Sequence, residues 1–411
     1  MIKAIKGMKD ILPEEIPQWR RIEQAARDVF ESYLYREIRT PVLEPTELFS
    51  RSIGNATDIV EKEMYTFEDS HQSVSMRPEN TAGVVRALIE ARLYEARGPQ
   101  RYYYVGPMFR RERPQKGRFR QFHQIGIEAF GDPGPYVDAE IIQMTCRFFR
   151  ELGIHGYEVR VNSLGCHTCR PAYVEKLKMA IYLIEGSLCE DCRRRRETNP
   201  LRVLDCKNCQ EQLSGLPLIT ENLCLPCLEH FDGFRAHLQQ FSIPYVLAPR
   251  LVRGLDYYTR TAFEFASVSG ALGSQNSLLG GGRYDGLVKN LGGPEVVGIG
   301  FALGIERLIL ALTGPPAEPT PVAYVAHLEM EGFRKAVELA EKLRDQGVAV
   351  AVANPLKQLK AQFKEADRIG ATTVYVIGPD EIRDGVVKVK DMTTGEQRVV
   401  PENDIVPSFS E

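Results

Sequence analysis

Basic, aromatic, amide and carboxylate side chains that could act together in chemistry are concentrated between Tyr102 and Phe130. The basic ones are Arg110, Arg111, Arg113, Lys116, Arg118 and Arg120. Arginine grips phosphate oxygens through a planar fork of N–H groups, so such a cluster favours a polyphosphate ligand. Phe122, Gln124 and Glu128 add an aromatic face, an amide, and a carboxylate that accepts from ring N–H or ammonium groups. The stretch therefore indicates a polyphosphate and a flat, nitrogen-rich ring bound side by side.

Two strands joined by a basic loop are expected to position these groups. Residues 102–109 are aromatic and β-prone, and the Pro and Gly within 112–117 interrupt a strand. Successive side chains of a strand point to opposite faces. One face of the return strand thus carries Phe122, Gln124, Gly126 and Glu128, and the other carries His123, Ile125, Ile127 and Ala129. The second face predicts contact with a core. A solvated hairpin without a ligand is the alternative interpretation.

Residues 109–124, which read FRRERPQKGRFRQFHQ, closely resemble motif 2 of the histidyl-tRNA synthetases, a family of class II aminoacyl-tRNA synthetases. Other stretches resemble further motifs of this family, in the family's order. They are a predicted helix 13–36 with a strand in 38–49 (motif 1, the family's dimer interface), a turn and helix start at 76–83, two histidine-binding signatures at 251–260 and 280–286, and a strand–helix junction at 298–308 (motif 3).

Two details of these stretches carry structural expectations. The family usually has Gly where this chain has Asn80, and Asn is the commonest substitute where φ is positive, so we expect the turn before a helix 81–96 to survive. Gly280–Gly282 are expected to form a tight turn or a close approach. A dinucleotide-binding loop is excluded because no G-x-G-x-x-G lies between a strand and a helix.

Composition limits the class of protein. The 411 residues allow about two to four domains, and 43% hydrophobic with 26% charged residues is ordinary for a globular protein. A net charge of −3 argues against a protein that coats polyanions, so any nucleic acid must bind local basic patches. No apolar run approaches the ~18 residues of a membrane helix, and the first residues lack the apolar core of a signal peptide. We expect a cytoplasmic protein without a membrane partner.

Eight of the nine cysteines form four Cys-x-x-Cys pairs: Cys166/Cys169, Cys189/Cys192, Cys206/Cys209 and Cys224/Cys227. Two such pairs together supply the four thiolates of a closed structural zinc site, so four pairs permit two sites with three possible pairings. Zinc would stabilise a small domain with little core. Redox activity is disfavoured because no thioredoxin-like βαβ pattern surrounds a pair. The main alternative is that the cysteines are small buried residues retained after the loss of a metal.

These patterns predict a mixed α/β fold with several domains. The resemblance implies an antiparallel-sheet catalytic domain and a C-terminal anticodon-binding domain, and the alternating strands and helices of the C-terminal part predict an α/β domain there. The Arg193–Arg196 run is interpreted as solvated helix surface or as a contact to acceptor-stem phosphates. The expected boundaries are catalytic domain, first part, 1–164; cysteine-rich helical insert 165–249; catalytic domain, second part, 250–312; proline-rich linker 313–321; and anticodon-binding domain 322–411.

The resemblance implies a histidine–tRNA ligase that acts in two steps. The histidine carboxylate attacks the α-phosphate of ATP, and the 3′-terminal ribose hydroxyl of tRNA(His) then attacks the adenylate. ATP with Mg2+, L-histidine, tRNA(His) and a second copy of the chain are the implied partners. One alternative is a histidine-sensing regulatory paralogue of ATP phosphoribosyltransferase, which characteristically lacks the anticodon domain and the ATP-binding arginines. Another is a zinc-ribbon nucleic-acid-binding protein, which leaves most of the chain unexplained.

The resemblance also implies the role of each site residue. The catalytic residues would be Arg253 and Arg110, both at the α-phosphate. ATP would be bound by Arg110, Glu112, Arg118, Phe122 and Arg307, with Phe122 stacked on adenine. Histidine would be bound by Glu79, Thr81 and Gln124 at its α-amino end, by Glu128, Tyr258 and Tyr284 at its imidazole, and by Arg110, Arg253 and Tyr257 in the rest of its site.

Overall fold

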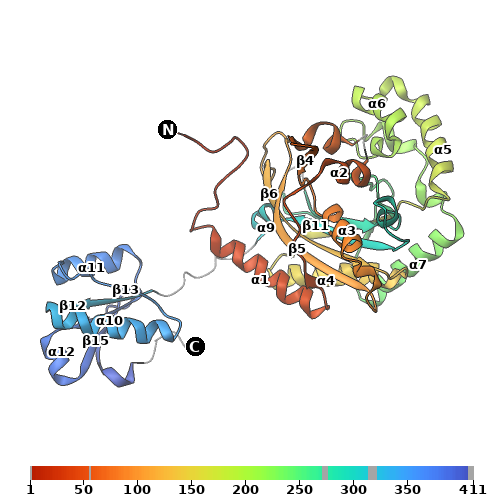
Figure 1. The fold of residues 1–411 in the computed structure, drawn as a ribbon. Helices are drawn as coiled ribbons and strands as arrows, with labels where there is room; N and C mark the ends of the chain where they lie inside the picture. Colours follow the sequence, from red (N-terminus) through yellow and green to blue (C-terminus); the bar gives the residue numbers. More distant parts are fainter. Residues whose placement is uncertain (1, 55–56, 271–275, 313–321, 406–411) are drawn as a thin grey trace. The chain divides into compact units, whose positions relative to one another are not determined.

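The computed structural model describes residues 2–54, 57–270, 276–312 and 322–405. The chain divides into two compact units, Met1–Pro316 and Ala317–Glu411 (Figure 1). Each unit has hydrophobic clusters of its own. The linker expected over 313–321 lies outside the described residues.

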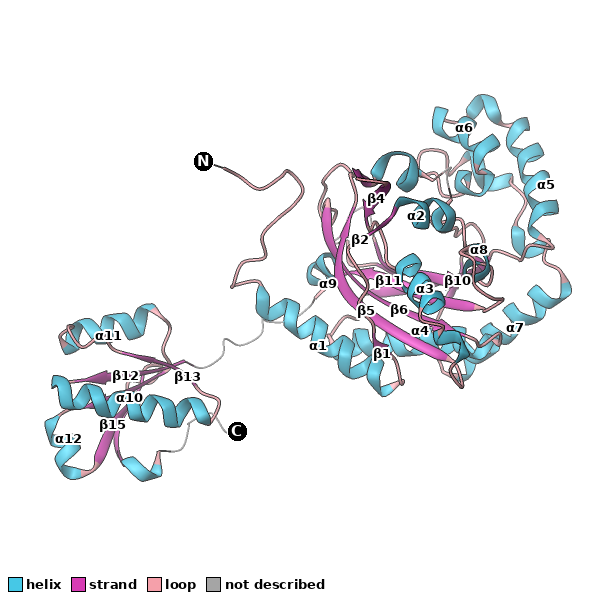
Figure 2. Cartoon of the chain, in the orientation of Figure 1, coloured by secondary structure: helices cyan, strands magenta, loops and turns pink. Residues whose placement is uncertain are grey.

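A sheet of eight strands forms the centre of the large unit (Figure 2). The strand order is β1-β5-β6-β11-β10-β9-β7-β8. The edge strands β1 and β8 pair in parallel with their neighbours, and all the strands between them pair antiparallel, which confirms the predicted antiparallel sheet. The bounds are β1 Arg36–Glu37, β5 Gln100–Phe109, β6 Gln121–Phe130, β11 Gly298–Gly304, β10 Ser277–Arg283, β9 Thr259–Ser267, β7 Tyr157–Ser163 and β8 Val246–Leu247.

The alternation predicted for the return strand, β6, is confirmed. Ile125 and Ile127 lie in the main core, which also contains apolar side chains of the helices α1 (Ile16–Ser32), α4 (Pro135–Glu151) and α7 (Leu225–Gln240). Phe122 and Gln124 line a cavity on the other face. Side chains of a strand alternate between its two faces. Once the helices bury one face of β6, the side chains on the cavity face are therefore determined.

The segment before the hairpin differs from the sequence-based expectation. The strand expected within 38–49 is short, β2 (Leu43–Pro45), and a helix, α2 (Thr46–Ile53), follows directly. Apolar side chains at helical spacing in α2 are buried, which explains the helix. β2 joins β4 (Gln72–Met76) and β3 (Tyr65–Asp69) in a small second sheet.

Helix α3 (Thr81–Glu90) also ends earlier than position 96, because Arg92 adopts a left-handed conformation with φ 50°. The turn before it survives, but the expected positive φ at Asn80 is wrong, since φ is −122°. Asparagine fits this position through its side chain instead: Asn80 Oδ1 accepts hydrogen bonds from Thr40 Oγ1 at 2.6 Å and from Arg77 Nη1 at 3.3 Å.

The turn expected at Gly280–Gly282 is also wrong, because these residues lie within strand β10. The close approach expected there is found. A Cβ atom on Gly280 would overlap the Arg253 guanidinium, and one on Gly281 would overlap the Gly300 carbonyl oxygen on the neighbouring strand. Glycine is therefore required by packing across the strand rather than by a turn.

The cysteine-rich part is helical, as predicted, with α5 (Arg170–Leu183) and α6 (Glu190–Thr198) joined by short turns. Its last part packs with the sheet: Phe234 and Leu238 of α7 lie in the main core, and β8 pairs with β7. The first 60 or so residues of the expected insert pack in a second hydrophobic cluster with residues of α3, β5 and the loop before β9, whereas α7 covers the same sheet face as α4.

The small unit confirms the predicted alternation of strands and helices. Its sheet has the order β13-β12-β14-β15-β16, parallel in the first three strands and antiparallel in the last two pairs. Helix α12, which was not expected from the sequence, precedes β15. The bounds are β12 Val322–His327, α10 Glu329–Asp345, β13 Ala349–Val352, α11 Leu359–Arg368, β14 Thr373–Ile377, α12 Pro379–Asp384, β15 Val386–Asp391 and β16 Gln397–Pro401.

Candidate active site

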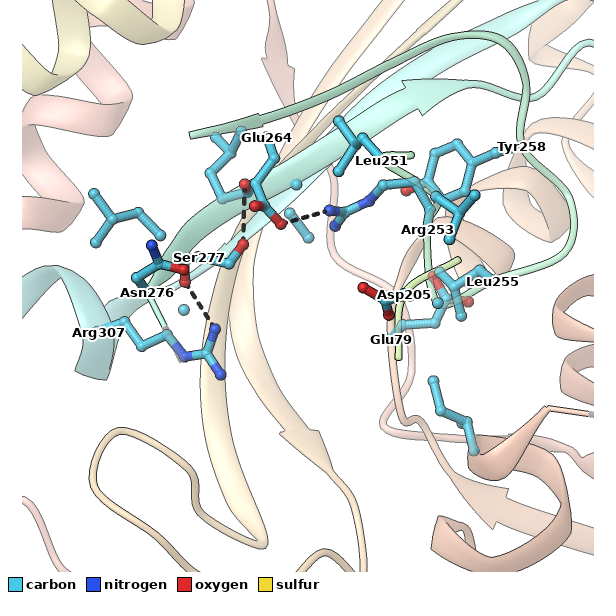
Figure 3. Close-up of a pocket in the computed structure, with 18 of the residues that line it drawn as sticks. Glu79, Asp205, Leu251, Arg253, Leu255, Tyr258, Glu264, Asn276, Ser277 and Arg307 are labelled. Atoms are coloured by element: carbon cyan, nitrogen blue, oxygen red, sulfur yellow. Dashed lines mark hydrogen bonds and ion pairs between the residues drawn. The ribbon is translucent and has the colours of Figure 1, made fainter. Parts of the chain in front are cut away.

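A cavity of about 1010 Å3 lies on the second face of the large sheet. Its walls come from β6, β9, β10 and β11, from the loop 248–258, and from residues 202–210 of the insert. Figure 3 shows side chains from several of these elements converging on it. The predicted site residues in the wall are Glu79, Thr81, Arg110, Glu112, Arg118, Phe122, Gln124, Arg253, Tyr257, Tyr258 and Arg307.

The basic loop between β5 and β6 brings two arginines to one carboxylate. Arg118 lies 3.0 Å and Arg110 3.8 Å from Glu112. Arg110 also donates from Nε to the Pro78 carbonyl at 2.9 Å, and its guanidinium carbon lies 5.3 Å from the centroid of the Phe122 ring. The predicted combination of guanidinium groups and a flat aromatic face is thus present in one wall.

Arg253, on the loop before β9, donates to Glu264 at 3.2 Å (Figure 3). The bare backbone of Gly280 lets the guanidinium lie against β10. Sequence reasoning did not select Glu264 as a site residue. A signal was available, because Phe263 and Phe265 are core-type side chains in an alternating strand, which places Glu264 on the cavity face.

Arg307 stands in the first turn of α9 (Ile305–Ala311) at the end of β11. It donates to the Ser277 carbonyl at 2.7 Å and to the Gly117 carbonyl at 3.3 Å. Burial lowers the pKa of Arg307, and the positive charge of Arg118 lowers it further. A bound polyanion would relieve the repulsion between these two guanidinium groups.

Gln124 presents an unsatisfied acceptor. Its Oε1 atom is buried and has no hydrogen-bond partner among the residues that the structure describes. A buried acceptor without a donor costs free energy, so this oxygen suits a ligand that brings an N–H group.

Glu79 lies just before helix α3 and Thr81 is the first residue of that helix; together they link the cavity to a deeper network. Glu79 accepts from the backbone N–H groups of Thr81 at 2.7 Å and of Ala82 at 3.0 Å. The Thr81 hydroxyl donates to Glu128 at 2.6 Å, and the Tyr284 hydroxyl donates to the other oxygen of Glu128. Glu128 and Tyr284 are buried and are not in the cavity wall. The structure places these two predicted residues behind Thr81.

The two carboxyl groups of this network both have pKa values above the usual range. Burial raises the pKa of Glu128 to about 8, although the hydrogen bonds from Thr81 and Tyr284 oppose the shift. Burial also raises the pKa of Glu79, against the hydrogen bonds from its two backbone donors. At neutral pH Glu128 is therefore largely protonated, and a protonated carboxyl group can donate as well as accept.

Tyr257 and Tyr258 complete the inner end of the cavity. Their ring centroids are 4.7 Å apart, and the Tyr284 ring lies 5.6 Å from that of Tyr257. Burial raises the pKa of Tyr258 to about 12 and that of Tyr257 well above its usual range. The phenols stay neutral and keep their hydroxyl groups as hydrogen-bond donors.

The eight paired cysteines of the insert form two groups, each of which could hold a metal ion. The root cluster consists of Cys166, Cys169, Cys224 and Cys227. The tip cluster consists of Cys189, Cys192, Cys206 and Cys209. The structure thus selects one of the three pairings that the spacing leaves open: the first pair with the fourth, and the second with the third.

Comparison with known proteins agrees with this geometry. The family model of histidyl-tRNA synthetase matches residues 7–168 and 213–308, and that of an anticodon binding domain matches residues 322–411. The histidine–tRNA ligase of Anaeromyxobacter dehalogenans is 49% identical, over 100% of this chain and 99% of its own. That of Geobacter sulfurreducens is also 49% identical, over 98% and 97%. The crystal structure of apo S. aureus histidyl-tRNA synthetase is 37% identical, with a TM-score of 0.83 over 98% of each chain.

An antiparallel sheet with arginines on one face, together with an anticodon-binding α/β domain, defines the class as an aminoacyl-tRNA synthetase. The 49% identity to a histidine–tRNA ligase over the full length of the chain narrows this class to one family. The chain belongs to the histidyl-tRNA synthetase family. Among the described residues, no helix has both the length and the apolar character that crossing a membrane requires.

Proposed function

We propose that the cavity activates L-histidine with ATP and that the chain then transfers the histidyl group to the 3′ end of tRNA(His). In the first step the histidine carboxylate attacks the α-phosphate, histidyl-adenylate forms and pyrophosphate leaves. The observation that carries the proposal is a single cavity lined by Arg110, Arg253 and Arg307 and by Gln124, whose buried Oε1 atom has no hydrogen-bond partner among the described residues.

The two substrates react with each other, so no side-chain nucleophile is required. The protein contributes positioning and stabilisation of the charge that develops on phosphate oxygens. Arg110 and Arg253 hold the α-phosphate, and Arg118 and Arg307 hold the outer phosphates. ATP enters as its Mg2+ complex, which is a substrate rather than a resident cofactor.

The remaining cavity residues separate the base from the amino acid. Phe122 stacks on adenine, and Glu112 lies near the adenine amino group. Histidine is bound at its α-amino end by Glu79, Thr81 and Gln124, at its imidazole by Glu128, Tyr258 and Tyr284, and between them by Tyr257. A site with buried donors and acceptors rejects apolar amino acids, because their binding leaves those groups unpaired.

The partners and domain limits predicted from the sequence complete the proposal. The chain acts as a cytoplasmic homodimer that pairs through α1 and the strand within 38–49. The small unit, 322–411, binds the anticodon of tRNA(His) and follows the linker 313–321. The catalytic domain occupies 1–164 and 250–312, with the insert at 165–249. Zinc is a structural component of the insert and takes no part in the reaction.

A histidine-sensing regulatory paralogue is less well supported. The chain matches histidine–tRNA ligases over its full length, and it has the anticodon-binding domain that such a paralogue characteristically lacks. Arg110, Arg118, Arg253 and Arg307 all line the cavity.

The proposal is tested by exchange of labelled pyrophosphate into ATP with each amino acid in turn. Histidine is expected to support exchange, and glutamine and phenylalanine are expected to support none. Comparable exchange with either of these two would contradict the assigned specificity.

A further inference from the structure

The sulfur atoms of the insert have the spacing of metal ligands. In each cluster the four sulfur atoms lie within 4.8 Å of one another. In the root cluster, Cys166 Sγ is 3.7 Å from Cys224 Sγ and 3.9 Å from Cys169 Sγ, and Cys169 Sγ is 3.9 Å from Cys227 Sγ. A tetrahedron with Zn–S bonds of about 2.3 Å has sulfur–sulfur edges of about 3.8 Å. These three separations match that value.

Other uses of cysteine fit the spacing less well. All eight cysteines are free, so the clusters are not pairs of disulfides. An iron–sulfur cluster places several irons and sulfides between its cysteine ligands, so its four ligand sulfur atoms cannot all lie within 4.8 Å of one another as they do in each cluster here. Cysteines that merely fill a core need not direct four sulfur atoms at one point. One metal ion held tetrahedrally at the centre of each cluster is the explanation that fits all of these observations.

The backbone around the sulfur atoms is arranged for charged ligands. The N–H groups of Cys166 and Thr168 donate to Cys169 Sγ at 3.3 Å and Cys166 Sγ at 3.4 Å. In the tip cluster, the Cys189 N–H donates to Cys209 Sγ at 3.3 Å. Gly165 has a φ of +65°, and a Cβ atom there would lie 2.8 Å from Cys169 Sγ. Donors of this kind stabilise thiolates and orient them toward a metal.

Helix α6 itself contributes little to the core of the insert, which is built from flanking residues such as Leu188, Val203 and Leu213. The only buried side chain of this nine-residue helix is Cys192. Short helices are marginal without packing, and binding of a metal to four thiolates supplies folding free energy that an apolar face would otherwise provide. Arg194 and Arg195 of α6 pair with Glu61 at 3.2 Å and Asp58 at 2.8 Å, which holds α6 against the cavity segment 58–63. Arg193 and Arg194 are nevertheless exposed, as expected for a solvated helix surface.

We propose that the insert binds two zinc ions, one in the root cluster and one in the tip cluster, and that the root ion positions the loop 248–258, which carries Tyr257 and Tyr258 in the wall of the cavity. Cys166 lies three residues after the end of β7, and Cys224 directly precedes α7, so the root ion joins the two points where the chain leaves the sheet and returns to the helix that packs on it. Arg170 comes directly after Cys169 and donates to the carbonyls of Leu164 and Tyr258. Tyr258 lines the cavity.

The metal count of the full-length chain, purified under reducing conditions and passed through a chelating resin, tests the sites. Inductively coupled plasma mass spectrometry is expected to give two zinc ions per chain. Cys166→Ser/Cys224→Ser is expected to lose one ion, and Cys166→Ser/Cys189→Ser to lose both. Cys146→Ser, outside both clusters, is expected to keep two.

The two double variants separate the pairings even if one of them folds poorly. If Cys166→Ser/Cys189→Ser keeps one ion while Cys166→Ser/Cys224→Ser keeps none, the proposed pairing is wrong. Fewer than about half an equivalent of zinc in the unmodified chain, or iron in its place, overturns the proposal. Cys189→Ser/Cys206→Ser leaves the root intact and is expected to retain one ion, which supplies a second measurement.

The positioning role rests on the proposed histidine site, whereas the metal count does not. Arg170→Gln is expected to keep two zinc ions and to raise the KM for histidine at least fivefold in pyrophosphate exchange, with a smaller change in kcat. An unchanged KM overturns the positioning role and leaves the metal sites standing. Two zinc ions in a chain without histidine-dependent exchange would contradict the proposed function alone.

Discussion

Glu128 is expected to make the stability of the large unit depend on pH between about 5 and 8. Its pKa is raised from 4.5 to about 8 in the folded protein, chiefly by burial. Between those values the folded state holds a proton that the unfolded chain has released. The free energy of unfolding therefore falls as pH rises, by about 1.4 kcal/mol per pH unit. The stabilising effect is complete below the unfolded pKa and is lost by the time pH passes the folded pKa. From pH 6 to pH 8 the loss is roughly 2–3 kcal/mol.

Glu128→Gln isolates this effect because an amide has nearly the same shape and does not ionise. Trp19 is the sole tryptophan and lies in the main core, so its fluorescence reports unfolding of the large unit. Urea unfolding of both proteins at pH 6, 7 and 8 is the assay. With an m-value of about 3 kcal/mol/M, the midpoint of the unmodified protein should fall by roughly 0.8 M relative to that of the variant.

Other titrating groups contribute to both proteins and cancel in the difference. If the two midpoints change in parallel from pH 6 to pH 8, Glu128 is already ionised at pH 6. The reasoning that burial outweighs the hydrogen bonds from Thr81 and Tyr284 would then be refuted.

Two further predictions concern the reaction. Arg253→Ala should slow single-turnover adenylate formation about 100- to 1000-fold and weaken histidine binding much less, because charge develops on the α-phosphate only in the transition state. A change of less than about tenfold by rapid quench would make Arg253 structural. Deletion of residues 320–411 should leave histidine-dependent exchange detectable but abolish efficient charging of tRNA(His), because each unit has its own core. Charging by the truncated chain at the rate of the intact one would remove the anticodon role from the small unit.

Local periodicity was enough to predict the faces of β6. Whether Gln124 or Ile125 points to the core depends only on alternation and on which face is apolar, and both are visible in neighbouring residues. The strand glycines were misread for the opposite reason. A run of glycine signals either a turn or a close contact, and the choice depends on Arg253, which packs on Gly280 from a distant loop.

Contacts between distant segments account for the rest of what the sequence could not supply. The Thr81–Glu128 hydrogen bond joins the start of a helix to a strand, and nothing in either segment indicates the other. The cysteine spacing fixed the ligand pairs but not which pairs meet, because that depends on the path of α5 and α6. The conformation at Asn80 was predicted from its backbone preference. The side-chain hydrogen bonds to Thr40 and Arg77 are instead the reason why asparagine fits this position.

Every arginine proposed to hold phosphate already has an acceptor from the protein itself. Arg118 is paired with Glu112, Arg253 with Glu264, and Arg307 with two carbonyl groups. An incoming anion must therefore compete with these internal acceptors. A small anion such as inorganic phosphate can replace one of them at a time and gains little, whereas a triphosphate replaces several in a single event. The empty cavity therefore favours ligands that present several phosphate oxygens at once. When pyrophosphate departs, the arginines can pair again with the same acceptors of the protein.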